Sequence, residues 1–242
     1  MLYKSYCMVI PNFLTPQEVE YIHGYAQNLE IITAKIGNND FDVDGERARQ
    51  GDDGGAIDES IRQSTNRWLD HSDPRFDPVL KQKIQDGMMS ANQQAGWNYE
   101  LEHMETWQYT IYEHQPNLPS GDFYTWHTDS SADLYPNGMT RKLSASIQLS
   151  PPEDYEGGHF QWIETTDVFD QIKFNQDACE YIDRLPYPKS IPYDKLVQTA
   201  PFSGKELGSL LVFPSWLHHQ VTPVTRGVRK SLVIWNTGWP LR

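Results

Sequence analysis

The sequence predicts a mainly β fold with flanking helices, in which an antiparallel sandwich or jelly roll forms the core and helices pack outside it. Two capped amphipathic helical segments fall within the first hundred residues, and about eight short strand-like segments follow from Tyr99 onward. A chain of 242 residues suits one such domain. We therefore expect a single domain over 1–242, with a helical support layer and loops over 1–100 and the jelly-roll core over 101–242.

The first segments combine a short strand with a capped helix. Residues 6–10 have strand character, and Thr15 then offers an N-cap, followed by Pro16 at the first helical position and Glu18 at the capping-box position. The apolar residues of this helix fall on one stripe, namely Val19, Ile22, Ala26 and Leu29. Residues 31–36 are expected to form a strand. Residues 37–57 are rich in Asp and Gly, lack the ordered spacing of a calcium loop, and predict a mobile loop.

A second helix follows the same rules after a strand-like segment at 61–64. Asp77 and Pro78 supply the cap and the first helical residue, and Gly96 stands where a helix typically ends. The buried face of this helix is predicted to comprise Leu80, Ile84 and Met88.

The remaining segments are predicted to form the β core. Residues 102–112 form an aromatic and β-branched strand, and a turn at 116–121 precedes the segment that contains His127. Strand 143–149 alternates, with apolar residues at its odd positions and Ser144, Ser146 and Gln148 at its even positions. A turn at 156–158 and strands at 159–163, 208–213, 219–224 and 229–237 complete the set. The alternation indicates a barrel with an apolar outer face and a polar lumen.

Composition narrows the classes of partner. The net charge of −13 and the pI near 4.9 argue against nucleic acid and favour a neutral or basic partner, although the charge also serves plain solubility. Cys7 and Cys179 form no disulfide framework and no paired metal motif, and we expect small buried side chains. The first ten residues lack the features of a signal peptide, and no apolar run could span a bilayer. We expect a soluble, cytoplasmic protein without a membrane partner.

His127 and Asp129 are the first candidate for a chemical site. Residues two apart in an extended segment project to the same face, so both can bind one ion. Together they make two thirds of the 2-His-1-carboxylate set that binds Fe(II). The alternative is a loop carboxylate that caps an exposed histidine. The segment 213–224, which contains two adjacent histidines, offers a third ligand, and Arg229 follows it.

Four blocks of sequence resemble the iron- and 2-oxoglutarate-dependent dioxygenases, in particular the prolyl 4-hydroxylase-like branch. They are His127-x-Asp129, residues 141–150 with 155–158, His219-x-Val221-x-Pro223-Val224 and Arg229-x-Ser231. The resemblance covers roughly residues 101–235 and implies a double-stranded β-helix core, which is a jelly roll of the cupin type. The spacing to Val221, Pro223 and Arg229 selects His219 over His218 as the ligand, and we expect His218 to be partly exposed or to lie behind the ligands. The histidines at 23, 71, 103, 114 and 159 are taken as structural.

The resemblance also implies cofactors and roles for particular residues. The metal ligands would be His127, Asp129 and His219, and they would leave positions on Fe(II) for 2-oxoglutarate and O2, with ascorbate as reductant. The cosubstrate would be contacted by Arg229, Tyr112, Gln148, Ser231 and Trp235. Arg229 suits the distal carboxylate because a guanidinium offers a planar, permanently charged fork. Tyr112 and Trp235 could equally be ordinary core aromatics.

The segment 164–201 departs from the compact members of this family, because it lengthens the connection between Asp129 and His219. It is rich in Pro and Tyr and fits neither the helical nor the strand period. We expect it to form a lid over an extended substrate groove, with the 37–57 loop as a second wall. The alternative is a surface insertion on the flank of the barrel.

The function implied is hydroxylation of a C–H bond coupled to the conversion of 2-oxoglutarate to succinate and CO2. The expected substrate is a prolyl residue of a protein or peptide, possibly basic. A free amino acid or other small metabolite is the alternative substrate. A jelly-roll protein that binds a metal without redox chemistry is a third possibility, which Arg229 disfavours because such a site needs no buried cation nearby.

Overall fold

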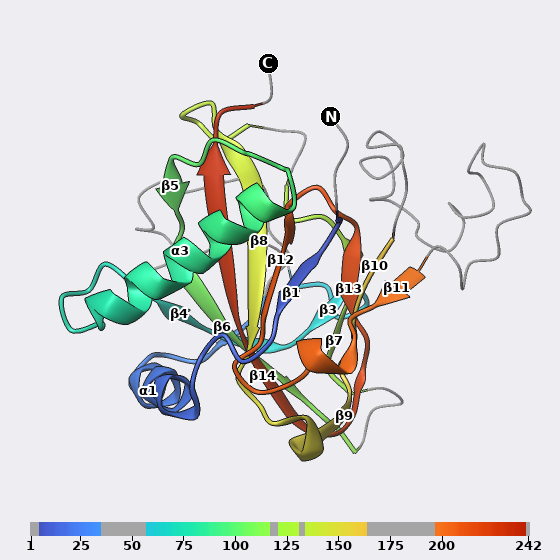
Figure 1. Ribbon diagram of the computed structural model, residues 1–242. Helices are drawn as coiled ribbons and strands as arrows, with labels where there is room; N and C mark the ends of the chain where they lie inside the picture. Colours follow the sequence, from blue (N-terminus) through green and yellow to red (C-terminus); the bar gives the residue numbers. More distant parts are fainter. Residues whose placement is uncertain (1–4, 35–56, 117–120, 131–133, 164–196, 241–242) are drawn as a thin grey trace, which may run out of the picture.

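The computed structural model describes residues 5–34, 57–116, 121–130, 134–163 and 197–240. Their helices are α1 (Pro16–Ala26) and α3 (Pro78–Gln94), with short 3-10 turns at Pro152–Asp154 and Phe202–Gly204. Both α-helices lie on the same side of the molecule (Figure 1). Within these residues no helix has the length and apolar character needed to cross a membrane.

The strands form two sheets. The nine-stranded sheet runs in the order β1-β12-β8-β14-β6-β4-β2, with β5 and β9 attached to β14, and the five-stranded sheet runs β11-β10-β13-β7-β3. The strands of the larger sheet are β1 (Met8–Ile10), β2 (Ile32–Thr33), β4 (Thr65–Leu69), β5 (His103–Met104), β6 (Trp107–Glu113), β8 (Thr140–Gln148), β9 (Tyr155–Gly157), β12 (Leu210–Pro214) and β14 (Val224–Gly238). Those of the smaller sheet are β3 (Arg62–Gln63), β7 (Phe123–His127), β10 (Phe160–Ile163), β11 (Val197–Thr199) and β13 (His219–Val221).

Two apolar cores lie on the two faces of the larger sheet. The outer core joins buried residues of α1 and α3 to residues of β6, β8, β12 and β14, including Ile22, Ile84, Ile147 and Leu232. The inner core lies between the sheets and joins Phe213 of β12 to Phe160 of β10 and Val221 of β13. The helices therefore cover the outer face of the larger sheet, and the smaller sheet covers its inner face (Figure 1). This is the double-stranded β-helix architecture that the sequence predicts.

The predicted start of α1 is confirmed. The Thr15 hydroxyl accepts a hydrogen bond from the Glu18 backbone N–H, and the Glu18 carboxylate accepts one from the Thr15 backbone N–H at 2.7 Å. Glu18 also accepts hydrogen bonds from the Lys83 ammonium of α3 at 2.7 and 2.8 Å. The capping box thus joins the first helix to the second as well as starting it.

Replacing Thr15 by alanine should lower the free energy of unfolding by about 1 kcal/mol, because an N-terminal donor of α1 loses its acceptor. The measurement is the midpoint of thermal or urea unfolding. Thr15→Ser keeps the hydroxyl and should unfold close to the original protein. Equal losses in both variants would show that the capping hydrogen bond contributes nothing.

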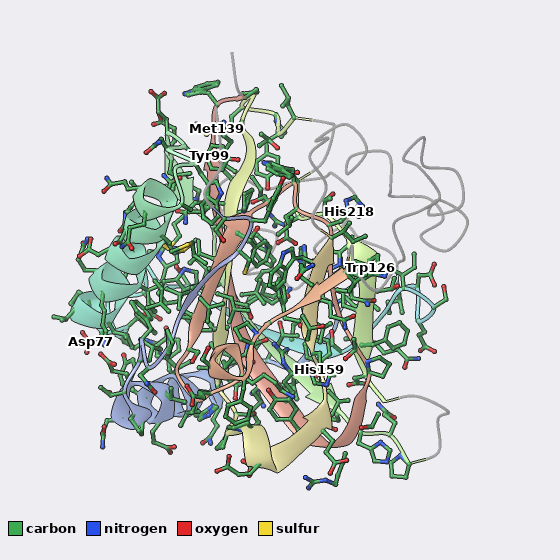
Figure 2. The ribbon with its side chains drawn as sticks, turned by 45° about the vertical axis from the view of Figure 1, so that its right-hand side comes forward. Asp77, Tyr99, Trp126, Met139, His159 and His218 are labelled. Atoms are coloured by element: carbon green, nitrogen blue, oxygen red, sulfur yellow. The ribbon has the colours of Figure 1, made fainter. Side chains whose placement is uncertain are left out.

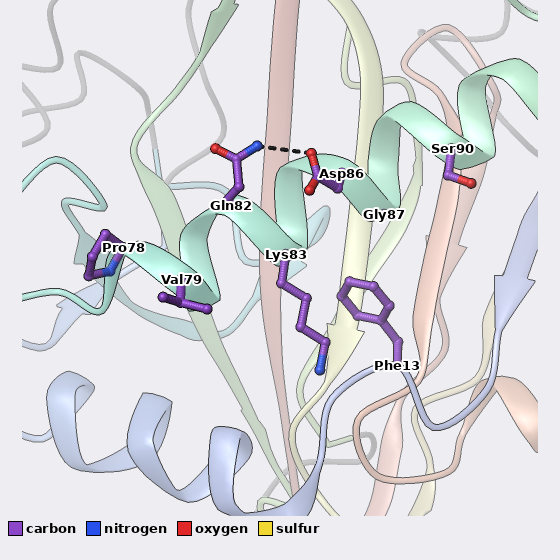
Figure 3. Close-up of a pocket in the computed structure, with 8 residues that line it drawn as sticks. All are labelled: Phe13, Pro78, Val79, Gln82, Lys83, Asp86, Gly87 and Ser90. Atoms are coloured by element: carbon purple, nitrogen blue, oxygen red, sulfur yellow. Dashed lines mark hydrogen bonds between the residues drawn. The ribbon is translucent and has the colours of Figure 1, made fainter.

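Helix α3 approaches the loop before α1 closely at Gly87. A Cβ at this position would lie 2.6 Å from the Phe13 ring, so only glycine fits without displacing it. Figure 3 shows the Phe13 ring beneath Gly87 and the Gln82 amide donating to Asp86 on the exposed side of the helix. A hollow lined by α3 and Phe13 opens here, and it includes none of the predicted site residues.

Strand β8 confirms the alternation predicted for 143–149. Leu143, Ala145 and Ile147 belong to the outer core with the helices. Ser144, Ser146 and Gln148 are buried on the opposite face, and the Ser144 and Ser215 hydroxyls are 2.8 Å apart. The inner wall of the larger sheet is therefore polar along this strand, as expected for a lumen that binds a polar ligand.

Several strand boundaries differ from those predicted. The single strand expected over 102–112 is broken at Glu105, whose carboxylate accepts hydrogen bonds from Arg141 and from the Tyr135 hydroxyl. Strand β4 was not predicted, because Thr65–Leu69 shows no apolar alternation. The last strand is much longer than 229–237, and part of the segment expected to be irregular forms β11 against β10. The loop at 35–56, the segment 164–196 and Cys179 lie outside the described residues.

Candidate metal centre

Three predicted ligands converge between the ends of β7 and β13. His127 ends β7, His219 begins β13, and the two residues are register partners in the antiparallel pair. Asp129 follows β7, where its backbone N–H donates to the Ser215 carbonyl at 2.9 Å. The ligand atoms of the three side chains all lie within 4.8 Å of one another. The Asp129 carboxylate is 3.6 Å from the Nε2 atom of His127 and 3.7 Å from that of His219.

Local hydrogen bonds orient both imidazoles. The Nδ1 atom of His127 is 2.7 Å from the Thr125 carbonyl, and that of His219 is 2.8 Å from the Leu217 carbonyl. A carbonyl only accepts, so each Nδ1 carries the proton and each Nε2 presents a lone pair. The Oδ2 atom of Asp129 is buried and has no hydrogen-bond partner among the described residues. Two imidazole lone pairs and a buried carboxylate oxygen fit a divalent iron ion.

The charge states of these groups also suit a metal. Burial alone would raise the pKa of the Asp129 carboxyl, but the neighbouring His219 and His127 and the Arg141 guanidinium hold this pKa well below its usual range. Burial and the neighbouring His127 lower the pKa of His219 to about 4. At neutral pH Asp129 is therefore an anion and His219 is neutral, which are the forms that bind metal ions.

His218 was expected either to be partly exposed or to lie behind the ligands. It is fully buried, so the first of these alternatives is wrong. Burial, together with the nearby His219 and His127, lowers the pKa of His218 to about 3. At neutral pH His218 is therefore a neutral, buried imidazole directly before β13. The group of possible ligands in the described residues comprises His127, Asp129 and His219, without His218.

Four of the predicted cosubstrate residues share the inner face of the larger sheet. Arg229 of β14 lies opposite Tyr112 of β6, and Ser231 of β14 lies opposite Gln148 of β8. All four are at most 3% exposed. The Arg229 guanidinium lies 5.4 Å from the centre of the Tyr112 ring, and its Nη1 donates to the Ser231 hydroxyl at 3.4 Å. The structure thus brings these side chains together around a buried cation.

This cation fits an anionic ligand. No carboxylate of a described residue forms a salt bridge with Arg229, and its Nε atom has no hydrogen-bond partner among those residues. The side chains of Tyr112 and Gln148 likewise form no hydrogen bond within the described part of the chain. A buried charge is costly unless a partner compensates it, so an anion such as a carboxylate would complete this cluster of side chains.

Trp235 lies further along the same face of β14, opposite Ser144. The Arg141 guanidinium lies 4.0 Å from the centre of its ring, and Arg141 forms a bidentate pair with Glu105. The Nε1 atom of Trp235 is buried without a hydrogen-bond partner among the described residues. The Trp68 ring also lies nearby, with its centroid 6.3 Å from that of the Trp235 ring. Trp235 therefore forms an aromatic wall at the opposite end of the strand from Arg229.

Two residues beside the metal centre were missed by the sequence analysis. The Tyr124 ring stacks on His127, with centroids 3.4 Å apart, and the Arg62 guanidinium lies 4.6 Å from the centre of the Tyr124 ring. No sequence signal pointed to Arg62, because residues 62–67 are all polar and show no alternation, although the structure buries Arg62, Ser64 and Asn66. Tyr124 gave none, because residues three apart on a regular strand face opposite ways.

The other histidines in the described residues lie outside this group. His23 contacts the Tyr109 hydroxyl at 2.8 Å and the Leu149 carbonyl at 2.9 Å, and His71 contacts two backbone carbonyls. Figure 2 shows Asp77 on the helical side of the molecule, and His159 and His218 on the side of the five-stranded sheet. His159 is half-buried, and burial and nearby cations lower its pKa.

Comparison with known sequences identifies similar proteins. The sequence model described as "2OG-Fe(II) oxygenase superfamily" matches residues 107–237, which include the three converging ligands and Arg229. A PKHD-type hydroxylase of Teredinibacter turnerae is 30% identical over 118 residues, which are 48% of this chain and 38% of that protein. The chain thus matches well under half the length of this relative.

Solved structures share the fold. A Pseudomonas putida prolyl-4-hydroxylase superposes with a TM-score of 0.54 at 18% identity, covering 96% of this chain and 92% of that one. A Trichoplax adhaerens prolyl hydroxylase in complex with a peptide fragment of hypoxia inducible factor gives a TM-score of 0.56 at 17% identity, covering 96% and 84%. At such low identity these likenesses concern the fold alone.

Proposed function

The chain belongs to the 2OG-Fe(II) oxygenase superfamily, and from this premise we propose that it hydroxylates a prolyl residue of a protein or peptide. The family uses Fe(II), 2-oxoglutarate and O2. In the proposed reaction one oxygen atom of O2 enters the hydroxyl group of the product. The other oxygen atom enters succinate as 2-oxoglutarate loses CO2. The C–H bond and the keto acid each supply two of the four electrons that reduce O2.

The observation that carries this proposal is the pairing of a three-ligand centre with an uncompensated buried cation. His127, Asp129 and His219 would hold iron, and Arg229 would bind the distal carboxylate of 2-oxoglutarate. A metal site without redox chemistry would not need a buried guanidinium that lacks a carboxylate partner among the described residues. This favours an oxygenase over a metal-binding jelly-roll protein.

The chain's own residues divide the work of such a reaction. Bound iron would supply the oxidising chemistry. His127, Asp129 and His219 would fix its position, Tyr112, Gln148 and Ser231 would orient the cosubstrate beside Arg229, and the two sheets would keep bulk water away. Trp235 and Arg141 would form the wall of the pocket at the other end of β14.

The substrate class rests on the named relatives. The similar proteins carry the names PKHD-type hydroxylase and prolyl-4-hydroxylase, and one was solved with a peptide bound. These names support a prolyl residue in a peptide. The net charge of −13 favours a neutral or basic peptide over an acidic one.

The test is succinate release from 2-oxoglutarate with Fe(II) and ascorbate, with and without substrate. One arm contains proline-containing peptides of neutral and basic charge, and a second contains free proline and other amino acids. Stimulation by peptides, with an added oxygen atom in their mass, supports the proposal. Stimulation by free amino acids alone moves the substrate to small metabolites, and the absence of any succinate refutes the oxygenase activity.

Gly158→Ala provides a second test near Arg229. A Cβ at Gly158 would lie 2.7 Å from the Arg229 Cδ atom, and its φ of +55° is in the left-handed region. The variant should displace Arg229 and raise the 2-oxoglutarate concentration needed for half-maximal succinate release by roughly tenfold. Gly24→Ala is the control, since nothing lies within 4 Å of that Cβ. An unchanged 2-oxoglutarate requirement in Gly158→Ala would count against Arg229 as the cosubstrate anchor.

A further inference from the structure

An irregularity in β7 places an aromatic ring against one of the proposed metal ligands. The register pairs His127 with His219 and Tyr124 with Val221, so three steps along β7 match two steps along β13. Strand β7 therefore carries one extra residue, which is a β-bulge. His219 and Val221 share one face of β13, so the bulge brings Tyr124 and His127 onto the facing side together. In a regular strand these two side chains would point in opposite directions.

The contact between Tyr124 and His127 is a parallel stack. The ring centroids are 3.4 Å apart and the ring planes differ by 12°. The hydrogen bond from Nδ1 to the Thr125 carbonyl fixes the tautomer of His127, and the stack restricts the tilt of its ring plane. Within the described residues His219 has no comparable neighbour, since the Phe213 and Phe160 rings meet its ring at 57° and 31°. Of the two imidazoles, only His127 is supported by a parallel ring among the described residues.

Arg62 holds the Tyr124 ring from another direction. Its Cζ atom lies 4.6 Å from the Tyr124 centroid, and since His127 covers one face of that ring, the guanidinium lies over the other. Arg62 itself is buried and fixed by three hydrogen bonds, from Nε to the Ser64 hydroxyl at 3.0 Å and from Nη2 to Asn66 and Gln108 at 3.2 and 2.9 Å. Asn66 and Gln108 belong to β4 and β6 of the larger sheet, and Ser64 immediately precedes β4. The guanidinium therefore connects Tyr124 of the smaller sheet to the larger sheet.

We propose that Tyr124, clamped by Arg62, is a positioning residue that holds the His127 imidazole in the plane needed for metal binding. The inference rests on the proposed metal centre, and it concerns the support of one ligand. Neither residue would touch the metal. A free imidazole can tilt about its bond to Cβ, so loss of the stack should weaken metal binding although all three ligands remain. Partners that orient a ligand in this way typically change metal affinity by about 10–100-fold.

The first experiment replaces Tyr124 in the full chain and measures the dissociation constant of Co²⁺ by its visible absorption. Tyr124→Phe keeps the ring and should bind Co²⁺ within about twofold of the original protein. Tyr124→Leu removes the ring and should bind roughly tenfold more weakly, with an altered absorption band. Equal affinity in folded Tyr124→Leu overturns the proposal, as does an equal loss in both variants, which would assign the effect to the hydroxyl group.

The second experiment replaces Arg62, because a charge effect and a clamping effect of this residue would change the Co²⁺ affinity in opposite directions. A nearby guanidinium repels a bound divalent cation, so if Arg62 acted only as a charge, Arg62→Met would tighten Co²⁺ binding. If Arg62 clamps Tyr124, the same variant weakens binding by several-fold. This result decides the question if Tyr124→Leu does not fold, and tighter or unchanged binding in Arg62→Met overturns the clamp.

Arg67→Met is the control for loss of an arginine that is half-buried and makes several hydrogen bonds. Arg67 donates to the Ala26, Gln27 and Leu29 carbonyls at the end of α1, away from the metal centre. This variant should unfold at lower temperature and keep its Co²⁺ affinity, and an equal loss of affinity in Arg67→Met and Arg62→Met refutes the positioning role.

His127→Ala separates the proposed metal centre from the proposed support of His127 by Tyr124. Equal Co²⁺ binding by His127→Ala and the original protein refutes the metal centre itself, whereas a normal loss there with no effect at Tyr124 refutes only the support.

Discussion

His219→Ala should abolish stoichiometric Fe(II) or Co²⁺ binding, and His127→Ala and Asp129→Ala should do the same. Each change removes one of the three ligands proposed among the described residues, whose donor atoms lie within 4.8 Å of one another. Loss of an outer partner already costs about 10–100-fold in metal affinity, so loss of a ligand should cost more than about a hundredfold. Anaerobic titration with Fe(II), or titration with Co²⁺ followed by absorption, measures the effect.

His218→Ala is the matched control, because it removes the same side chain one position away. It should keep most of the metal affinity, although a buried imidazole is lost and the protein should unfold more easily. Circular dichroism before each titration separates unfolding from loss of the site. If His218→Ala lost the metal and His219→Ala kept it, the assignment of ligands on this strand would be wrong by one residue.

Arg229→Ala should leave metal binding intact and raise the requirement for 2-oxoglutarate. The guanidinium is 1% exposed and has no carboxylate partner among the described residues, so the distal carboxylate of the cosubstrate would be its counterion. Loss of a charge-assisted bidentate contact costs on the order of 2–4 kcal/mol, or roughly thirtyfold to a thousandfold in affinity. The measurement is succinate release as a function of 2-oxoglutarate concentration.

Two comparisons make this result interpretable. Arg229→Lys keeps the positive charge without the planar fork and should lose less affinity than Arg229→Ala. Co²⁺ binding without cosubstrate should be the same in both variants as in the original protein. A 2-oxoglutarate requirement that did not change in Arg229→Ala would remove the main support for the oxygenase proposal.

Features that depend on residues close together in the sequence were predictable. The capping box of α1 needs only Thr15 and Glu18, and both predicted hydrogen bonds form. The alternation of β8 requires a period of two along one strand, and its apolar residues meet the helices as expected. His127, Asp129 and His219 could be recognised because the local motifs His127-x-Asp129 and His219-x-Val221-x-Pro223 are kept, although the connection between them is long.

Features that depend on the pairing of strands were not predictable. The bulge in β7 exists only relative to β13, so the stack of Tyr124 on His127 has no counterpart in the periodicity of the sequence. The burial of His218, which directly precedes β13, likewise follows from tertiary packing, because the period of a strand does not decide which way a residue outside the strand faces. Strand β4 is held by its pairing with β6, although its own residues have little strand pattern.

The continuity of β14 restricts where residues can be inserted into the chain. Arg229, Ser231 and Trp235 point to the same face of one continuous strand, and at about 3.3 Å per residue Arg229 and Trp235 are about 20 Å apart. Inserting one residue between them would turn Arg229 toward the outer face, where Leu232 and Ile234 pack in the helical core. Inserting two would keep the face and move the cation by about 7 Å. The strand therefore tolerates no change of length between Arg229 and Trp235 without moving the buried cation relative to the aromatic ring.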